Sequence, residues 1–171
     1  MTTEPRIYVA CLASYNAGTL HGVWIDCDGK DAQELTAEVE AMLAKSPVPC
    51  AEHAIHDHEG FDGFDVGEYT ALSDVAEIVA LLEEYGDVAR AAATLVMNDL
   101  EQVRSLRTEH YLGSWSSLEQ YAENLLDGQI DLPAGLACYF DYGAYGRDLE
   151  LSGDISTVET SDGEVHVFDN H

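Results

Sequence analysis

Between Lys45 and Arg90 the sequence contains eleven Asp and Glu residues and no Lys or Arg. The same imbalance holds for the whole chain, in which 33 acidic residues face seven basic ones and the formal net charge is -26 at pH 7. Self-repulsion on this scale opposes compaction. Because 46% of the 171 residues are hydrophobic, a core can nevertheless form. We therefore expect an ordered protein with a strongly negative surface.

The charge also limits the kinds of partner that the chain can bind. A negative surface repels nucleic acid and anionic membranes and attracts a basic protein groove. The N-terminal residues lack the basic start and apolar run of a secretory signal, and no apolar stretch is long enough to cross a membrane. We therefore predict a cytoplasmic protein that binds neither nucleic acid nor membrane.

The four cysteines, Cys11, Cys27, Cys50 and Cys138, have no metal-type spacing and lie among mostly apolar neighbours. We expect reduced, partly buried thiols. Two disulfides are the less favoured alternative, because no secretory signal is present.

Residues 1–61 have the pattern of a small sheet with one helix. Alternating apolar residues predict strands over 6–12, 20–26 and 51–58, and the periodicity of 31–44 predicts a helix. Asn16 and Gly18 are expected to form the turn between the first two strands. These residues form the predicted N-terminal α/β domain.

Residues 62–107 are predicted to be helical, after a connecting loop over 61–69. Ser73 is the expected N-cap of a helix that ends before Gly86, and shorter helices are expected over 89–97 and 100–107. A helical domain of this size is too small to be stable without neighbours.

Residues 108–171 combine both kinds of element in a predicted C-terminal α/β domain. We expect a strand over 111–115, a hairpin over 155–160 and 165–169, helices over 116–126 and 141–151, and Pro133 in the first turn of another helix. Ser116 and Glu119 are the expected capping box of the first helix. Gly143 and Gly146 are expected to weaken the last one.

Three histidines suggest a zinc site. His53, His56 and His58 have the spacing H-x2-H-x-H. On a regular strand, however, His56 and His58 share one face and His53 points to the other. Zinc binding is therefore the least favoured interpretation, and we predict no metal or other cofactor.

The motifs of common enzymes are absent from the sequence, which has no GxSxG, no Walker loop and no glycine-rich dinucleotide fingerprint. Residues 26–37 fail as a calcium loop, because Lys30 and Ala37 stand where oxygen ligands are required. With 33 acids, pairs of carboxylates arise by chance and do not indicate acid–base catalysis. No residue is predicted to be catalytic.

The spacing of carboxylates on the predicted helices says more about function than such chance pairs do. The rows are Asp31–Glu34–Glu38, Glu77–Glu84 and Glu119–Glu123–Asp127. A four-residue step advances about 6 Å along a helix. Like charges at this spacing destabilise a helix by about 0.2–0.5 kcal/mol per pair, and no Lys is interleaved to relieve them.

Such rows imitate the phosphates of duplex DNA, which carries about one charge per 1.7 Å of its axis. If two chains pair, their charge of twice -26 equals that of about 88 Å of duplex, or about 26 base pairs. Salt adaptation is the rival explanation, since proteins of very salty cytoplasm also replace Lys by Asp and Glu. Composition alone does not separate the two.

Six longer segments of the sequence indicate a protein family more specifically than the charge pattern does. They are RIYVACLASYNAGTLHGVWID (6–26), HEGF (58–61), EYTALSDVAEIVALLEEYGD (68–87), YLGSWSSLEQYAENLLDG (111–128), YFDYGAYGRDLELSGDI (139–155) and VHVF (165–168). In this order they resemble the ArdA-type antirestriction proteins over nearly the whole chain. Residues 88–110 resemble the family least.

The resemblance implies a cytoplasmic, non-enzymatic inhibitor encoded on mobile DNA. Such inhibitors mimic bent B-form DNA and occupy the DNA-binding groove of type I restriction-modification enzymes. The resemblance also implies an α+β fold drawn out into an elongated chain of three small domains, here 1–61, 62–107 and 108–171, which dimerises through the last.

Two sets of candidate residues follow. Tyr111, Leu112 and Trp115 form an aromatic stretch without charge and are the expected dimer contact. The expected DNA-mimic surface consists of Asp31, Glu34, Glu38, Asp57, Glu59, Asp62, Asp65, Asp74, Glu77, Glu84, Asp87, Glu119, Glu123 and Asp127. A salt-adapted globular protein of unknown activity is the first alternative, and a zinc protein that uses the three histidines is the second.

Overall fold

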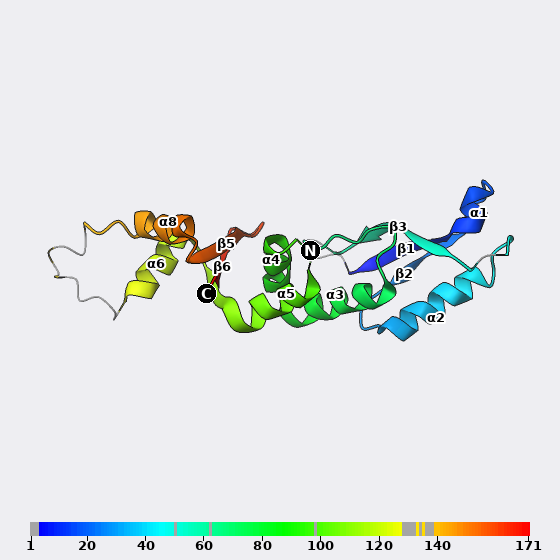
Figure 1. Cartoon of the computed structure of the whole chain (residues 1–171), viewed down its shortest axis with the longest axis horizontal. Helices are drawn as coiled ribbons and strands as arrows, with labels where there is room; N and C mark the ends of the chain where they lie inside the picture. Colours follow the sequence, from blue (N-terminus) through cyan, green and yellow to red (C-terminus); the bar gives the residue numbers. More distant parts are fainter. Residues whose placement is uncertain are drawn as a thin grey trace.

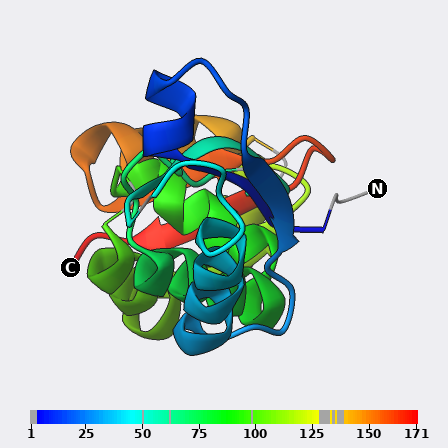
Figure 2. The same cartoon turned by 90° about the vertical axis from the view of Figure 1, so that its right-hand side faces the viewer.

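The computed structural model describes residues 4–49, 51–61, 63–97, 99–127, 133, 135 and 139–171. It confirms the expected α+β class, with two separate three-stranded sheets and several helices. The elements follow one another along a single long axis (Figure 1), and the molecule is narrow and rounded when viewed along that axis (Figure 2). The accessible surface is 9974 Å², whereas a compact protein of this mass would expose about 8,300 Å². The chain is therefore a rod rather than a sphere.

The first sheet is antiparallel, with β1 (Arg6–Cys11) between β2 (Gly22–Asp26) and β3 (His53–Glu59). Alternate residues of β1 point to the buried face of the sheet. The helix α2 (Ala32–Leu43) supplies the side chains Leu35, Val39 and Met42 to the same core. The periodicity of residues 31–44 therefore predicted this helix correctly.

The connection between β1 and β2 differs from the predicted turn at Asn16 and Gly18. It contains a short helix, α1 (Leu12–Asn16), because Cys11 Sγ accepts a hydrogen bond from the backbone N–H of Ser14 and caps the first turn. Ser14 is fully buried, and its hydroxyl lies 2.8 Å from that of Ser46, which is distant in the sequence. Gly18 follows the helix with a positive φ of 77°.

The two cysteines in the described part of the chain differ in oxidation state. Cys11 is disulfide-bonded, so the expectation of reduced thiols is wrong for this residue. Cys27 is a free, buried thiol, and burial raises its pKa to about 11. Cys50 and Cys138 lie outside the described residues. Sequence spacing does not reveal which distant thiols meet in space, and this is why the pattern misled.

Three helices fill the middle of the rod: α3 (Leu72–Tyr85), α4 (Asp87–Leu95) and α5 (Leu100–Ser105). The predicted cap of α3 is wrong, because Ala71 is the N-cap and the Ser73 hydroxyl donates instead to Asp74 Oδ1 at 3.2 Å. Gly86 ends α3 as predicted, with a positive φ of 53°.

After α5 the chain forms a π-helix, η1 (Leu106–His110), where an α-helix to residue 107 was predicted. The Thr108 hydroxyl donates to the carbonyl of Arg104 at 2.9 Å. Bonds of this kind compete with the regular helical ladder.

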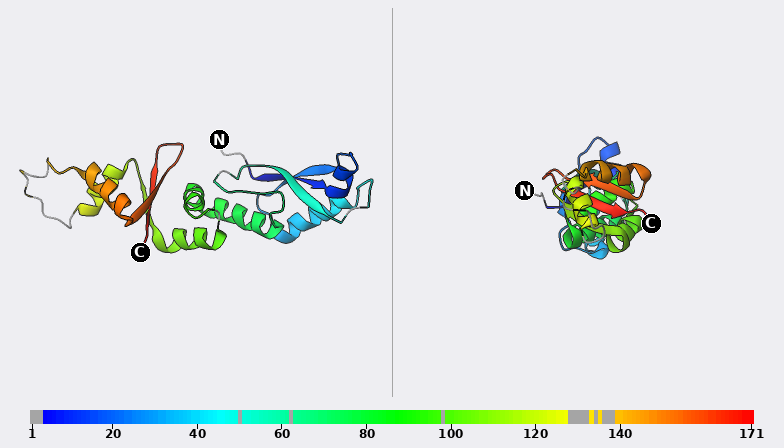
Figure 3. Two further views of the ribbon diagram at one scale, coloured as in Figure 1. Left: turned by 45° about the horizontal axis from the view of Figure 1, so that its top comes forward. Right: turned by 90° about the vertical axis from the view of Figure 1, so that its left-hand side faces the viewer.

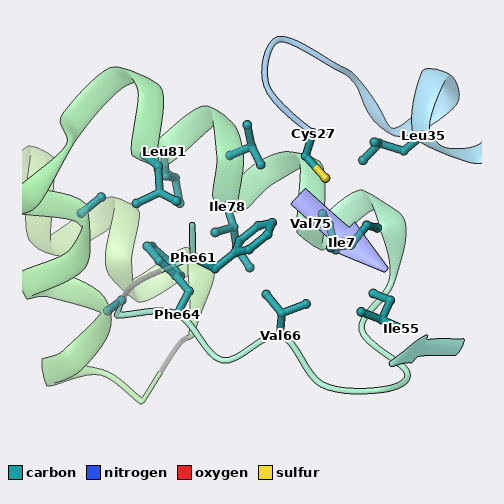
Figure 4. Close-up of a cluster of buried hydrophobic side chains, with 14 of the residues drawn as sticks. Ile7, Cys27, Leu35, Ile55, Phe61, Phe64, Val66, Val75, Ile78 and Leu81 are labelled. Atoms are coloured by element: carbon teal, nitrogen blue, oxygen red, sulfur yellow. The ribbon is translucent and has the colours of Figure 1, made fainter. Parts of the chain in front are cut away.

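One hydrophobic core joins the first sheet to the middle helices. It gathers Ile7 and Ile55 from the sheet, Phe61, Phe64 and Val66 from the connecting loop, and Val75 and Ile78 from α3 (Figure 4). The same cluster continues as far as Phe168 in the second sheet. The division of the chain into domains at 61/62 and 107/108 remains a prediction.

The second sheet is antiparallel and has the order β4-β6-β5, with β4 (Tyr111–Trp115), β5 (Ile155–Glu159) and β6 (Val165–Asp169). The predicted strand over 111–115 and the predicted hairpin are therefore confirmed. The helices α6 (Leu118–Leu126) and α8 (Tyr142–Ser152) pack against each other at the end of the rod (Figure 1).

The predicted capping box of α6 is wrong by one residue. Ser117 is the N-cap and accepts a hydrogen bond from the backbone N–H of Gln120. The Gln120 side chain accepts hydrogen bonds from the N–H and the hydroxyl of Ser116, so the helix begins one residue later than predicted. Around Pro133, residues 128–132, 134 and 136–138 lie outside the described residues, and the helix predicted there is not tested.

Two glycines were expected to weaken α8, yet the helix forms. A Cβ at Gly146 would lie 2.8 Å from Leu118 Cγ and 2.9 Å from the Leu118 carbonyl oxygen. The two helices can approach this closely because residue 146 has no side chain. At Gly143 the nearest atom to such a Cβ is the flexible end of Arg147, at 3.4 Å.

These distances predict opposite results for the two substitutions. Gly146→Ala should lower the free energy of unfolding by about 1–3 kcal/mol, because α6 backbone has to move away. Gly143→Ala, the matched control, should leave that free energy unchanged or raise it by up to about 1 kcal/mol through helix propensity. Urea denaturation followed by circular dichroism measures both. Equal effects of the two substitutions would contradict the close packing.

Candidate functional site: the carboxylate surface

Acidic side chains in the described part of the chain all lie at the surface. Ser14 and His166 are the buried polar residues found there, and no Asp or Glu is among them. Burying an ionised carboxylate without a partner has a high energetic cost. A chain with 33 acids and seven bases has too few cations to supply such partners, so its carboxylates remain in contact with solvent.

The row on α6 consists of three exposed carboxylates, Glu119, Glu123 and Asp127. No described Lys or Arg forms an ion pair with any of them. Asp127 is the C-cap residue of α6, where the helix dipole disfavours negative charge. This row is therefore a set of uncompensated charges, as the spacing predicted.

The row on α2 differs from the prediction, because its carboxylates are engaged in local structure. Asp31 is the N-cap and accepts hydrogen bonds from the N–H groups of Gln33 and Glu34, while Glu34 accepts one from the N–H of Asp31. Glu38 pairs with Lys30 at 2.6 Å. The prediction that no Lys relieves this row is wrong, since the turn before the helix brings Lys30 back onto it.

Arginines pair with three other acids of the predicted surface. Glu59 of β3 lies 2.6 Å from Arg6, Glu77 of α3 lies 2.8 Å from Arg104, and Asp87 lies 2.8 Å from Arg90. Glu59 and Glu77 are half-buried as a result. Glu77 is thus part of the contact between α3 and α5, and an ion pair engages this member of the predicted row Glu77–Glu84. The remaining described acids of the set, Asp57, Asp65, Asp74 and Glu84, are exposed, and Asp62 lies outside the described residues.

Exposed carboxylates outside the predicted rows add to the surface. Asp99 caps α5, and hydrogen bonds from Gln102 lower its pKa. Hydrogen bonds from Ser152 and Thr160 likewise lower the pKa values of Asp154 and Asp162. These groups therefore stay ionised at lower pH than ordinary carboxylates. Regular helical spacing missed them because they lie at a helix start, a helix end and a hairpin turn.

The histidines of β3 are arranged differently from the prediction. In the pairing with β1, Tyr8 lies opposite Asp57 and Val9 opposite Ile55, so His56 is the extra residue of a β-bulge. Because the bulge reverses the alternation, His53 and His58 lie on one face of the strand, not on opposite faces.

The three histidine rings nevertheless have separate surroundings. The His56 ring contacts that of Tyr15 at 4.9 Å, the His58 ring contacts that of Phe61 at 5.8 Å, and burial lowers the pKa of His53. Across the described ranges, no group of three or more His, Cys, Asp or Glu side chains could hold a metal ion.

The predicted dimer contact has one exposed member. The Tyr111 hydroxyl lies 2.9 Å from His166 Nδ1, and the Trp115 ring contacts that of Tyr121 at 4.7 Å. Leu112, between them, is 45% exposed. β4 is an edge strand of its sheet, since it pairs only with β6 in the described structure.

A comparison with protein families identifies the chain. The model of the family described as antirestriction protein (ArdA) matches residues 7–162. The chain belongs to the ArdA antirestriction family. The match includes α2, α3 and α6, and thus all the carboxylate rows. A search of curated proteins finds no match to the chain.

Membership of the ArdA family confirms the expected resemblance. It implies an inhibitor protein that interacts with restriction enzymes. Among the described helices, none has the length and apolar character needed to cross a membrane.

The uncompensated charge predicts how the stability of this ArdA protein depends on salt. Raising the ionic strength from about 0.01 M to about 0.15 M shortens the Debye length from about 30 Å to about 8 Å. The melting temperature should rise over this range, by about 2–4 °C for each 1 kcal/mol of repulsion relieved, and then level off. Thermal unfolding at increasing NaCl concentration, with sucrose as an uncharged control, measures this dependence of the melting temperature on salt. A protein that is unfolded below molar salt would support salt adaptation instead.

Proposed function

We propose that this ArdA protein is a DNA mimic that occupies the DNA-binding groove of a type I restriction-modification enzyme and blocks restriction. The observation that carries the proposal is the combination of a rod-like shape with carboxylates that all remain at the surface of the described chain. A DNA-binding groove is built to hold a long, narrow polyanion. The proposal extends to modification, because DNA has to enter the same groove of the methyltransferase core for methylation.

The distribution of charge supports binding in a basic groove rather than catalysis by this protein. Four of the seven basic residues, Arg6, Lys30, Arg90 and Arg104, are paired with acids of the same chain. The surface offered to a partner is therefore almost purely negative. We accordingly propose that the protein is not an enzyme and needs no cofactor, and that it acts in the cytoplasm of a cell that has received mobile DNA.

Competition with DNA tests the mimicry directly. A purified type I methyltransferase core is mixed with a fluorescent duplex that contains its target, and the protein is added at increasing concentration. We expect displacement of the duplex, and the affinity of the core for the duplex and for the protein should each fall steeply as salt is raised, because ion release drives both complexes. Inhibition without displacement of the duplex would contradict occupation of the groove.

The α6 row tests whether the contact is distributed over many carboxylates. Glu119→Gln, Glu123→Gln and Asp127→Asn together should weaken competition by roughly tenfold, and each alone only slightly, since an exposed ion pair contributes about 0.2–1 kcal/mol. Asp148→Asn, Glu159→Gln and Glu164→Gln form the matched control. They remove the same charge from exposed acids that lie outside the predicted surface.

The two triple variants separate geometry from net charge. A smaller effect of the control variant supports docking through the α6 row, whereas equal effects would mean that net charge alone matters. Loss of inhibition by one isosteric substitution, with the fold intact, would contradict the distributed contact.

We also propose that two chains pair through β4. The free edge of this strand can extend the sheet across a twofold axis. Beside it lies a groove of about 430 Å³, lined by apolar side chains (Leu112, Trp115, Leu125 and Leu149) and, on its polar side, by Asp154, Asp169 and His171. A contact centred on these apolar side chains would leave most carboxylates of both chains outside the interface, where water screens their repulsion. Two collinear rods would also double the length of the mimic.

Leu112→Asp should therefore give folded monomers from a wild-type dimer. Leu151→Asp is the matched control, because Leu151 is 84% exposed near the end of α8 and lies outside the proposed contact. Light scattering measures the mass, and circular dichroism checks the fold. A monomeric wild type would refute the dimer, and an unfolded Leu112→Asp variant would indicate that Leu112 stabilises the C-terminal core.

A further inference from the structure

Arg107 is placed in an unusual way for a cation in so acidic a chain. Its guanidinium carbon lies 4.6 Å from the ring centroid of Tyr85 and 5.8 Å from that of Tyr111. It forms no ion pair with any carboxylate of the described ranges, whereas four other basic residues do. Arg107 thus contacts two aromatic rings in surroundings where anions are abundant.

The two rings belong to different parts of the rod. Tyr85 is the last residue of α3, and Tyr111 is the first of β4. From Tyr111 the contacts continue into the second sheet, through the hydrogen bond to His166 and a ring contact with Phe168 at 5.3 Å. Both of these partners are buried. One guanidinium therefore connects the end of α3 to the edge and the centre of the second sheet.

The backbone at Arg107 also changes direction. Residues 106–110 form the π-helix η1, whose turn is wider than an α-turn because each hydrogen bond spans one more residue. The chain leaves this turn along β4, which runs at a steep angle to α5 (Figure 3). The contact between Arg107 and the two rings forms at this bend.

We propose that Arg107 is a positioning residue that sets the angle between the middle helices and the C-terminal end of the rod. A second contact, between α4 and β5, holds the two parts together, so Arg107 acts on their angle rather than on their attachment. The inference rests on the proposed function, because the angle determines whether the carboxylates of α3 and α6 follow the same curved groove. The partner in question is a basic groove that is already shaped to bent DNA.

The sign of the charge change makes this proposal testable. Replacing Arg107 by Met removes one cation and makes the protein more negative, so electrostatics alone predicts tighter binding to a basic groove. If binding weakens instead, the cause is a change of shape. Arg147→Met is the matched control, since Arg147 is exposed on α8, forms no ion pair within the described residues and undergoes the same substitution.

Small-angle X-ray scattering of the free full-length protein tests the angle, and competition with duplex DNA for the methyltransferase core tests its consequence. We expect Arg107→Met to alter the scattering curve with unchanged far-ultraviolet circular dichroism, and to weaken competition by about two- to fivefold. Arg147→Met should match the wild-type curve and compete at least as well. Arg107→Lys keeps the charge and the fold but loses the planar contact, and should fall between wild type and Arg107→Met.

The outcomes for the angle and for the function are distinct. If the scattering curves of Arg107→Met and Arg107→Lys both match that of the wild type, the proposal is overturned, whatever the two variants do in the competition with duplex DNA. An altered curve with undiminished competition would support the role of Arg107 in shape and count against mimicry of a curved duplex.

Discussion

An ionised carboxylate in this chain has to keep contact with water, because there are too few cations to neutralise it inside. This requirement limits how thick the molecule can be. A sphere of the same mass would bring the charges closer together and offer less surface on which to separate them. The rod meets the requirement with small layers of sheet and helix placed in line, so that no described Asp or Glu is buried.

Three of the few cations form ion pairs between different elements of the rod. Lys30 ties a turn to α2, Arg6 ties the start of β1 to the end of β3, and Arg104 ties α5 to α3. Exposed ion pairs contribute little to stability, typically up to about 1 kcal/mol. Their larger effect here is to cancel repulsion between elements that must lie side by side. Arg107 differs from these three, since it forms no ion pair within the described residues and contacts two aromatic rings at the place where the rod bends.

The candidate surface was predictable where no cation from another segment pairs with the row of carboxylates, and not where one does. On α6 the spacing of Glu119, Glu123 and Asp127 indicated an exposed row, and the row is exposed and unpaired within the described structure. On α2 and α3 the same kind of spacing misled, because Lys30 and Arg104 reach Glu38 and Glu77 from other segments. Spacing along a helix shows which residues share a face, but it carries no information about what approaches that face.

By itself the sequence determined the α+β class, most of the strands and helices, the C-terminal ends of α2, α3 and α6, and the negative surface, because these depend on local periodicity and on composition. Only the tertiary structure decided the bulge that redirects His56, the helix between β1 and β2, the close approach at Gly146 and the position of Arg107. The bulge, the close approach and the Arg107 contact each depend on an atom contributed by a distant segment, and the helix between β1 and β2 combines a local cap with the contact of Ser14 to the distant Ser46. The physical reason is that a local pattern records which side chains a segment prefers to bury, whereas a contact between segments is settled by the space and the hydrogen-bond partners that the rest of the fold provides.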